Sequence, residues 1–210
     1  MDKVRIITIE REFGSGAPAI AKLLAERLGW KLWDDRMTKE IARLAHCAEA
    51  QVAKREERMD PLYYRLMKSF LRGSYEGSLN VQRLNLLDTD VIFRLTERIV
   101  HSAADEGNCV IVGRGAAFFL KERKDAFHVF LYAPADVKIR RLTESGTDRA
   151  EAIEQVETVD RERADFIKRY FGIEWPDRRY YYLMVNTAIG DEAVVQTILN
   201  GIAVMENQTW

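Results

Sequence analysis

The alternation of apolar and polar positions predicts that strands and helices follow one another along the chain. Five short runs are rich in β-branched, aromatic and other apolar residues, and they predict strands: 4–9, 31–33, 109–112, 127–132 and 180–185. Runs such as VRIITI and CVIV show no polar alternation, which is typical of strands covered on both faces. Between them, apolar residues recur at helical spacing. This pattern predicts an α/β fold.

Helical spacing is clearest in five segments, of which the first begins near Pro18, where the fixed φ of proline suits a helix start. Its apolar residues are Ile20, Leu23, Leu24 and Leu28. The other segments are 37–46, 85–106, 149–169 and 191–205, and a further helix is expected to begin at Pro134. Residues 49–86 are charged and aromatic in patches. They predict a helical subdomain over the rim of the sheet, whose basic residues either line a substrate cleft or form a solvated face.

The segment Val4–Leu28 reads as a strand, a glycine-bearing loop and a helix in immediate succession. Such a loop presents backbone N–H groups and the positive end of a helix dipole, which favours phosphate, and glycines at 14 and 16 let the backbone approach an anion closely. We therefore place a phosphate site at residues 13–18: Phe13, Gly14, Ser15, Gly16, Ala17 and Pro18. The alternative is a connection that binds nothing.

This loop matches the phosphate-loop pattern G-x-x-x-x-G-K-[ST] poorly. Arg11 stands in the place of the first glycine, Ala17 in that of the lysine, and Pro18 in that of the magnesium-binding hydroxyl. Losing a partly shielded lysine near a phosphate forfeits on the order of 4 kcal/mol for charges about 4 Å apart at an effective dielectric of about 20. Another cation is needed, and Arg11 is the best candidate because it enters the loop from the end of the strand.

Length and composition describe an ordinary globular chain of 210 residues, 47% apolar and 31% charged. The net charge of −1 provides no global attraction to nucleic acid or to an anionic membrane, so neither is expected as a partner. No run of 18 apolar residues and no signal-peptide pattern is present. Cys47 and Cys109 are interpreted as reduced, small apolar side chains. These features predict a cytoplasmic protein.

Polar residues that directly follow predicted strands are candidates for ligand contacts, because open α/β sheets bind ligands at the carboxyl ends of their strands. Asp34 and Asp35 follow the second strand, where they either contact a ligand or cap the next helix. Arg114 lies between two glycines after the third strand and can grip a phosphate or pair with Asp34 or Asp35. His128 alternates with core residues and is interpreted as structural.

Two cation-rich helices in the second half of the chain predict a mobile lid that closes over polyphosphate. They are joined by the turn at residues 145–148. Their cations include Lys138, Arg140, Arg141, Arg161, Arg163, Lys168 and Arg169. Acidic residues are interleaved with these cations, so the alternative is that the charges form i,i+4 pairs on solvated faces.

Several short motifs appear in order: IEREFGSG, WDD, CVIVGRG, FLYAP, VDRER, IEWPDRRYYY and VNT. Together they resemble the cytidylate-kinase-like family of P-loop kinases over about the whole chain. The resemblance implies a P-loop NTPase-like three-layer sandwich: a single domain, residues 1–210, with a five-stranded parallel sheet, a helical acceptor-side insertion at 49–86 and lid helices at 138–170. It also implies ATP on the first loop, an acceptor nucleotide over Asp34 and Arg114, and lid contacts from arginines after residue 139, including Arg140 and Arg169.

The chain departs from its relatives, which commonly carry a G-S-G-G-R-E run, because Ala17, Pro18 and Ala19 follow Gly16. Tyr181–Tyr182 also replaces an aromatic–Asp pair, which removes a carboxylate. The leading hypothesis is an ATP-dependent kinase of a CMP-like acceptor, with Arg11, Arg161 and Arg163 as catalytic cations. Mg²⁺ would be held through phosphates and water, with Asp34 or Asp35 in its outer shell and no dedicated protein ligands.

Two rival hypotheses stay open. One is a regulatory protein that binds a nucleotide without turning it over, which Ala17, Pro18 and Tyr182 favour. The other is a structural or partner-binding protein that uses the aromatic segment 175–182 and residues 50–86 as its contact surface. A homodimer is compatible with all three.

Overall fold

The computed structural model describes residues 3–34, 36–37, 39–41, 43–44 and 89–207. The predicted insertion at 49–86, Asp35 and Cys47 lie outside the described residues. The described residues between 36 and 44 are helical. Among the helices that the structure describes, none is long and apolar enough to cross a membrane.

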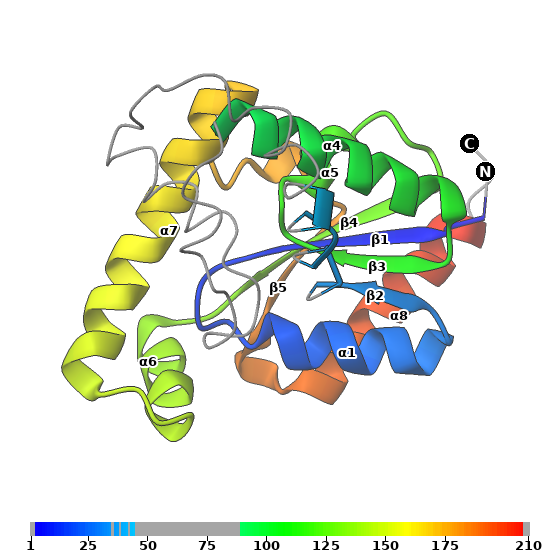
Figure 1. The fold of residues 1–210 in the computed structure, drawn as a ribbon. Helices are drawn as coiled ribbons and strands as arrows, with labels where there is room; N and C mark the ends of the chain where they lie inside the picture. Colours follow the sequence, from blue (N-terminus) through cyan, green and yellow to red (C-terminus); the bar gives the residue numbers. More distant parts are fainter. Residues whose placement is uncertain (1–2, 35, 38, 42, 45–88, 208–210) are drawn as a thin grey trace, which may run out of the picture.

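The core of the molecule is a five-stranded parallel sheet, as predicted (Figure 1). Its strands are β1 (Ile6–Arg11), β2 (Lys31–Trp33), β3 (Cys109–Val112), β4 (Ala126–Tyr132) and β5 (Leu183–Asn186). The spatial order is β2-β3-β1-β4-β5, so β1 lies in the centre between β3 and β4. In register, Ile9 lies beside Val112, and Arg11 beside Leu131. The segments that follow β1, β3 and β4 therefore leave the sheet at the same edge.

Helices cover both faces of the sheet, which makes three layers. These helices include α1 (Ala17–Leu28), α4 (Thr89–Glu106), α5 (Ala116–Phe119), α6 (Ala135–Glu144), α7 (Arg149–Phe171) and α8 (Asp191–Asn207). Alternate residues of β1 divide between the faces: Ile7 and Ile9 pack with α1 and α8, whereas Ile6 packs with α4, α5 and the end of α7. Figure 1 shows α6 and most of α7 beyond the carboxyl edge of the sheet, in the region where the strand-end loops gather.

The fifth strand begins three residues later than predicted. Residues Arg178–Tyr180 form a 3-10 turn, and Tyr181 packs against Phe130 of β4 with 5.1 Å between the ring centroids. Tyr181 thus covers the sheet, the Tyr182 amide makes the first hydrogen bond to β4, at 2.9 Å to the His128 carbonyl, and Leu183–Asn186 then pair with β4 in register. The short helix α5 was also missed, because four residues carry no periodic signal.

His128 is buried on β4, where its Nδ1 lies 2.7 Å from the hydroxyl of Thr8. Burial is the main cause that lowers its pKa from the ordinary value near 6.5 to about 4. Between pH 6.5 and pH 4 the unfolded chain therefore binds more protons than the folded chain, and acid favours unfolding.

We expect the free energy of unfolding to fall by about 2.5 kcal/mol through this residue alone when the pH is lowered from 7.5 to 4.5. Urea unfolding of wild type and His128→Asn at both pH values measures it, with His101→Asn, an exposed histidine of α4, as the control. Equal pH dependence of wild type and His128→Asn would contradict the assignment.

Candidate functional site

The loop between β1 and α1 has the backbone geometry of an anion-binding loop. Gly14 and Gly16 adopt φ of +73° and +81°, in the left-handed region that side chains other than glycine rarely enter. Gly16 is the N-cap of α1, no side chain caps the helix, and its first turn carries no acidic residue. No acidic or capping side chain therefore satisfies the positive end of the α1 dipole, and a helix start of this kind suits a phosphate group.

The second helix at this loop is α6, which brings two cations onto the glycines. A Cβ at Gly14 would lie 3.1 Å from Cβ of Lys138, and a Cβ at Gly16 would lie 3.1 Å from Nη1 of Arg141. Lys138 and Arg141 are three residues apart and share one face of α6. The glycines thus permit the close approach of α6 as well as the backbone conformation.

Arg141 ties the loop to the segment that follows β5. Its Nη1 donates to the carbonyl of Ser15 at 2.6 Å and to Oγ1 of Thr187 at 2.7 Å, while Nη2 donates to the carbonyl of Thr187 at 2.9 Å. The Thr187 hydroxyl, which is fully buried, also donates to the Ser15 carbonyl at 2.6 Å. One guanidinium therefore links α6, the loop and the segment that follows β5.

Lys138 lies between two carboxylates. Its Nζ donates to Oε2 of Glu12 at 2.9 Å and lies 3.6 Å from Oδ2 of Asp160. The lysine side chain is only 10% exposed. The stem of Lys138 thus packs on Gly14 while its ammonium is held between Glu12 and Asp160, and no cation stands at position 17, where the usual lysine of such loops would lie.

Helix α7 contacts the loop through Asp160 and Arg163. Asp160 Oδ1 accepts a hydrogen bond from the Phe13 amide at 2.8 Å and another from Nη1 of Arg163 at 2.7 Å. The same Nη1 donates to the carbonyl of Arg11 at 2.8 Å. Burial raises the pKa of Asp160, although Arg163 and Lys138 oppose that effect.

A buried charged cluster lies under the loop at the end of β1. Glu10, Arg11, Arg114 and Arg163 are 1%, 6%, 1% and 4% exposed, so the arginines from β1, the β3–α5 connection and α7 all turn inward. Burial raises the pKa of Glu10, and the three guanidiniums oppose that rise. Arg114 has φ of +62°, an uncommon backbone conformation for a residue with a side chain. Such strain is often found at functional sites.

The structure brings some of the predicted site residues together. Residues 14–17 form the loop itself. Arg11 and Arg163 lie directly beneath it, and Arg114 joins the charged cluster around Glu10. Arg11 reaches Gly113, at which an added Cβ would lie 1.8 Å from its Nη1. Asp34 is buried at the end of β2, one strand beyond β3.

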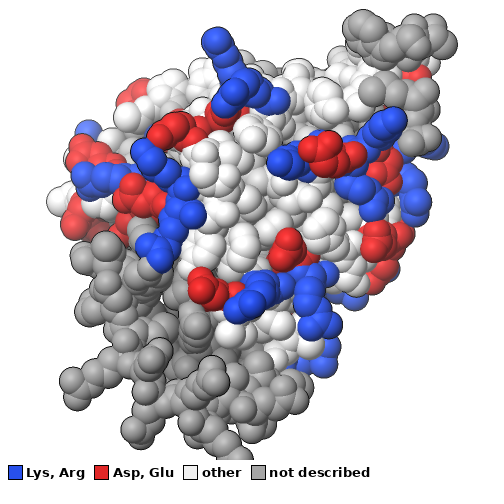
Figure 2. Space-filling model, turned by 90° about the horizontal axis from the view of Figure 1, so that it is seen from above, with Lys and Arg blue, Asp and Glu red and all other residues white. Residues whose placement is uncertain are grey.

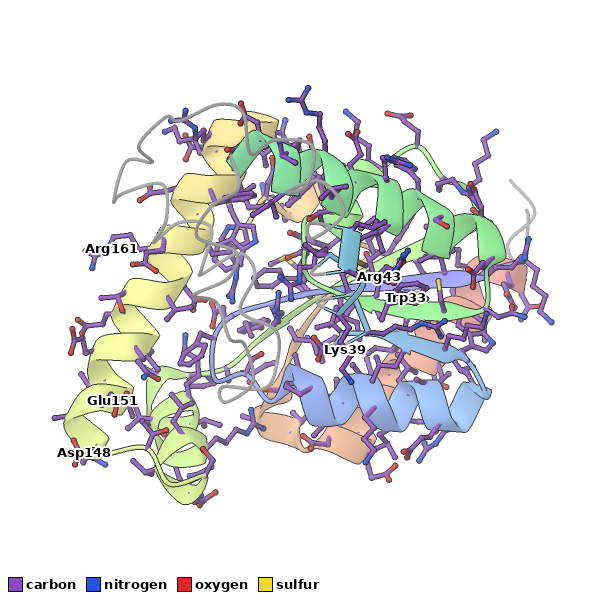
Figure 3. All side chains as sticks on the ribbon, viewed as in Figure 1. Trp33, Lys39, Arg43, Asp148, Glu151 and Arg161 are labelled. Carbon is purple, nitrogen blue, oxygen red and sulfur yellow. The ribbon has the colours of Figure 1, made fainter. Side chains whose placement is uncertain are left out.

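Other predicted residues lie further out. Arg140, Arg161 and Arg169 are exposed, and Figure 3 shows Arg161 extending from the outer side of α7. Pro18 is partly exposed at the start of α1. Phe13 packs on a small apolar cluster formed by α6 and α7, which contains Leu142, Ala152 and Val156.

Sequence reasoning counted Lys138 and Arg141 among the cations of the predicted lid, but it assigned no contact with the loop to Glu12, Asp160 or Thr187. For the predicted residue Arg163 the sequence held a signal of its inward orientation, because Arg163 continues the apolar stripe of Val156, Val159 and Phe166 along α7. The carboxylates Glu12 and Asp160 carried no such signal, since their partners come from distant segments.

Charges elsewhere on the described surface are mixed. Figure 2 shows Lys and Arg beside Asp and Glu across one face of the molecule, which agrees with the net charge of −1. No group of three or more His, Cys, Asp or Glu side chains that could hold a metal ion occurs within the described part of the chain. The concentration of buried cations around the β1–α1 loop is therefore a local feature.

The sheet order, the glycine loop and the flanking helices define an α/β protein with the three-layer fold of P-loop kinases. A family model for the cytidylate kinase-like family matches residues 6–189, and the chain belongs to this family. Membership in a kinase-like family supports phosphoryl transfer as the reaction class and a nucleotide as ligand. A comparison with curated proteins found no match.

Solved structures share the fold. An uncharacterized protein from Eubacterium ventriosum aligns with a TM-score of 0.66 and 21% identity, covering 95% of this chain and 98% of that chain. Shikimate kinase from Acinetobacter baumannii in complex with shikimate aligns with a TM-score of 0.53 and 19% identity, covering 98% and 96%. A sugar kinase from Janibacter sp. aligns with a TM-score of 0.50 and 14% identity, covering 95% of each chain. At these identities the likeness concerns the fold.

Proposed function

We propose that the protein transfers the γ-phosphoryl group of ATP to a small acceptor, and that a nucleoside monophosphate such as CMP is the first acceptor to test. The observation that carries this proposal is the uncapped start of α1, preceded by two left-handed glycines and surrounded by buried cations. Phosphoryl transfer depends mainly on positioning and on charge stabilisation, which such a site can supply.

The donor phosphates would lie against the amides of Gly14 to Ala17. Pro18 has no N–H, so the positive charge of side chains matters more here than in an ordinary phosphate loop. Lys138 and Arg141 supply part of the charge that the absent lysine would provide, in addition to Arg11. Mg²⁺ would be held through phosphate oxygens and water, with Asp34 in its outer shell.

The acceptor would lie over the ends of β2 and β3, between Asp34 and Arg114. These strands are neighbours in the sheet, and the guanidinium of Arg114 can donate two parallel hydrogen bonds to a phosphate. Arg163 already contacts the loop and would neutralise charge in the transition state. Arg140, Arg161 and Arg169 are exposed and could contribute only after a change in side-chain or helix position.

Production of ADP should be measured with CMP, dCMP, UMP, AMP and shikimate as acceptors. We expect turnover with at least one monophosphate, and we expect Arg114→Lys to raise the KM of that acceptor by at least about 10-fold while the KM of ATP stays within about twofold. Arg94→Lys, an exposed change on α4, is the matched control. Absence of ADP with every acceptor would refute the catalytic proposal.

A second candidate function, nucleotide binding without turnover, is favoured by a specific observation: Ala17 replaces the lysine, and Lys138 is already paired with Glu12 and Asp160. In that case Mg-ATP at about 100 times its Kd would stabilise the fold by about 2.7 kcal/mol while no ADP forms. Thermal unfolding with and without Mg-ATP therefore distinguishes a silent binder from a protein that does not bind ATP.

A further inference from the structure

Residue 13 of the loop is attached to helix α7 in two ways. The Phe13 amide donates to Oδ1 of Asp160 at 2.8 Å. The Phe13 ring packs on the apolar cluster to which Ala152 and Val156 of α7 belong. The residue that enters the glycine turn is therefore held by α7, a helix that lies more than 130 residues later in the chain.

A second contact from α7 holds the chain two residues earlier. Arg163 lies one helical turn after Asp160, and its Nη1 donates both to Asp160 Oδ1 at 2.7 Å and to the carbonyl of Arg11 at 2.8 Å. The pair thus binds an N–H and a C=O on either side of Glu12. Because the Arg11 carbonyl and the Phe13 amide are both held by α7, the backbone enters Gly14 from a fixed position.

We propose that Asp160 is a positioning residue for the phosphate loop: by holding the Phe13 amide against α7, its carboxylate sets the direction in which the amides of Gly14 to Ala17 point. A preorganised set of donors binds an anion better than one that must be ordered at binding. The consequence for ATP rests on the proposed function, whereas the effect on the loop itself does not.

A role in positioning and a role through charge predict opposite effects on ATP. Asp160 carries a negative charge near the expected phosphates, so its charge alone repels them, and removing that charge should tighten binding. If the carboxylate positions the loop, removing its hydrogen bond should weaken binding instead. Asparagine removes the charge but keeps an oxygen that can accept from the Phe13 amide, whereas alanine removes both.

Two measurements on wild type, Asp160→Ala, Asp160→Asn and the control Asp165→Ala test the proposal. Asp165 is exposed on the same helix. The first is the hydrogen-exchange rate of the Phe13 amide by NMR, and the second is the Kd of Mg-ATP by titration calorimetry. In Asp160→Ala we expect the Phe13 amide to exchange at least about 10 times faster and the Kd of Mg-ATP to be about 10 times higher than in wild type. In Asp160→Asn both the exchange rate and the Kd should lie within about threefold of wild type. Asp165→Ala should match wild type in both measurements.

Each outcome bears on one of the two proposals. A Phe13 amide that exchanges in wild type at the rate of an unstructured peptide overturns the positioning role without any variant, which keeps the proposal testable should Asp160→Ala not fold. Equal exchange in wild type and Asp160→Ala, or tighter Mg-ATP binding by both substitutions, also overturns it. If wild type does not bind Mg-ATP but exchange still responds to Asp160→Ala, the positioning of the loop stands and the proposed function fails.

Discussion

Arg141→Ala is expected to weaken the binding of Mg-ATP by about 30- to 150-fold, the largest effect of any single substitution on α6. The guanidinium makes two hydrogen bonds from Nη1 and one from Nη2, and all three end on Ser15 or Thr187. Hydrogen bonds to charged groups contribute about 1.5–3 kcal/mol each, but they are not additive, so we assign about 2–3 kcal/mol to the set. Titration calorimetry with Mg-ATP measures the loss.

Two further variants separate charge from geometry in this prediction. Arg141→Lys keeps the positive charge but cannot bridge Ser15 and Thr187 with a planar fork, so it should recover less than half of the lost binding free energy. Arg140→Ala removes the neighbouring cation, which is exposed. Comparing its affinity for Mg-ATP with that of Arg141→Ala shows which of the two arginines supports the loop. Lys22→Ala, an exposed cation of α1, is the control. Unchanged affinity in Arg141→Ala, with Arg140→Ala weakened, would contradict the role assigned to Arg141.

Gly113→Ala is expected to lower the free energy of unfolding by about 3–5 kcal/mol, the largest stability effect among the glycines at the site. Two causes combine. Gly113 has φ of +63°, which costs a residue with a side chain about 1–2 kcal/mol. In addition, the new Cβ would lie 1.8 Å from Nη1 of Arg11, so the buried guanidinium must move from its place beneath the loop. Urea unfolding at neutral pH measures the loss.

Gly29→Ala provides a matched control for the backbone term. Gly29 has nearly the same φ, +65°, and an added Cβ there would meet no atom within 4 Å. This variant should lose only about 1–2 kcal/mol. Similar losses in both variants would mean that the contact with Arg11 contributes nothing, and that Arg11 is not held by the end of β3.

The elements of the fold follow closely from local sequence. β2 and β3 have the predicted bounds, and α7 and α8 begin at Arg149 and Asp191 as expected, because apolar periodicity and helix-start signals lie within the segments themselves. The glycine loop was also visible, since left-handed turns require glycine and a strand–loop–helix succession is local. β5 was placed too early because an aromatic run reads as a strand whether it pairs with a neighbour or covers the sheet.

The partners of the loop could not be predicted in the same way. Helices α6 and α7 carry many cations, and neighbouring residues on a helix point about 100° apart, so packing decides which of these cations face the loop. α6 buries Val137 and Leu142, and this turns Lys138 and Arg141 toward Gly14 and Gly16 and leaves Arg140 exposed. α7 likewise turns Arg163 inward and Arg161 outward.

The sequence by itself thus determined the α/β architecture, the loop that suits phosphate and the absence of a lysine at position 17. Only the tertiary structure decided which cations lie near the loop. It also decided that Lys138 pairs with Glu12 and Asp160, and that Arg163 pairs with Asp160. The physical reason is the distance along the chain over which each effect acts. Hydrophobic periodicity and glycine conformation involve only a few consecutive residues, so the sequence reveals them. The contacts of Lys138 and Arg163 with residues 11 and 12 join segments more than 120 residues apart, and only the packing of α6 and α7 brings them together.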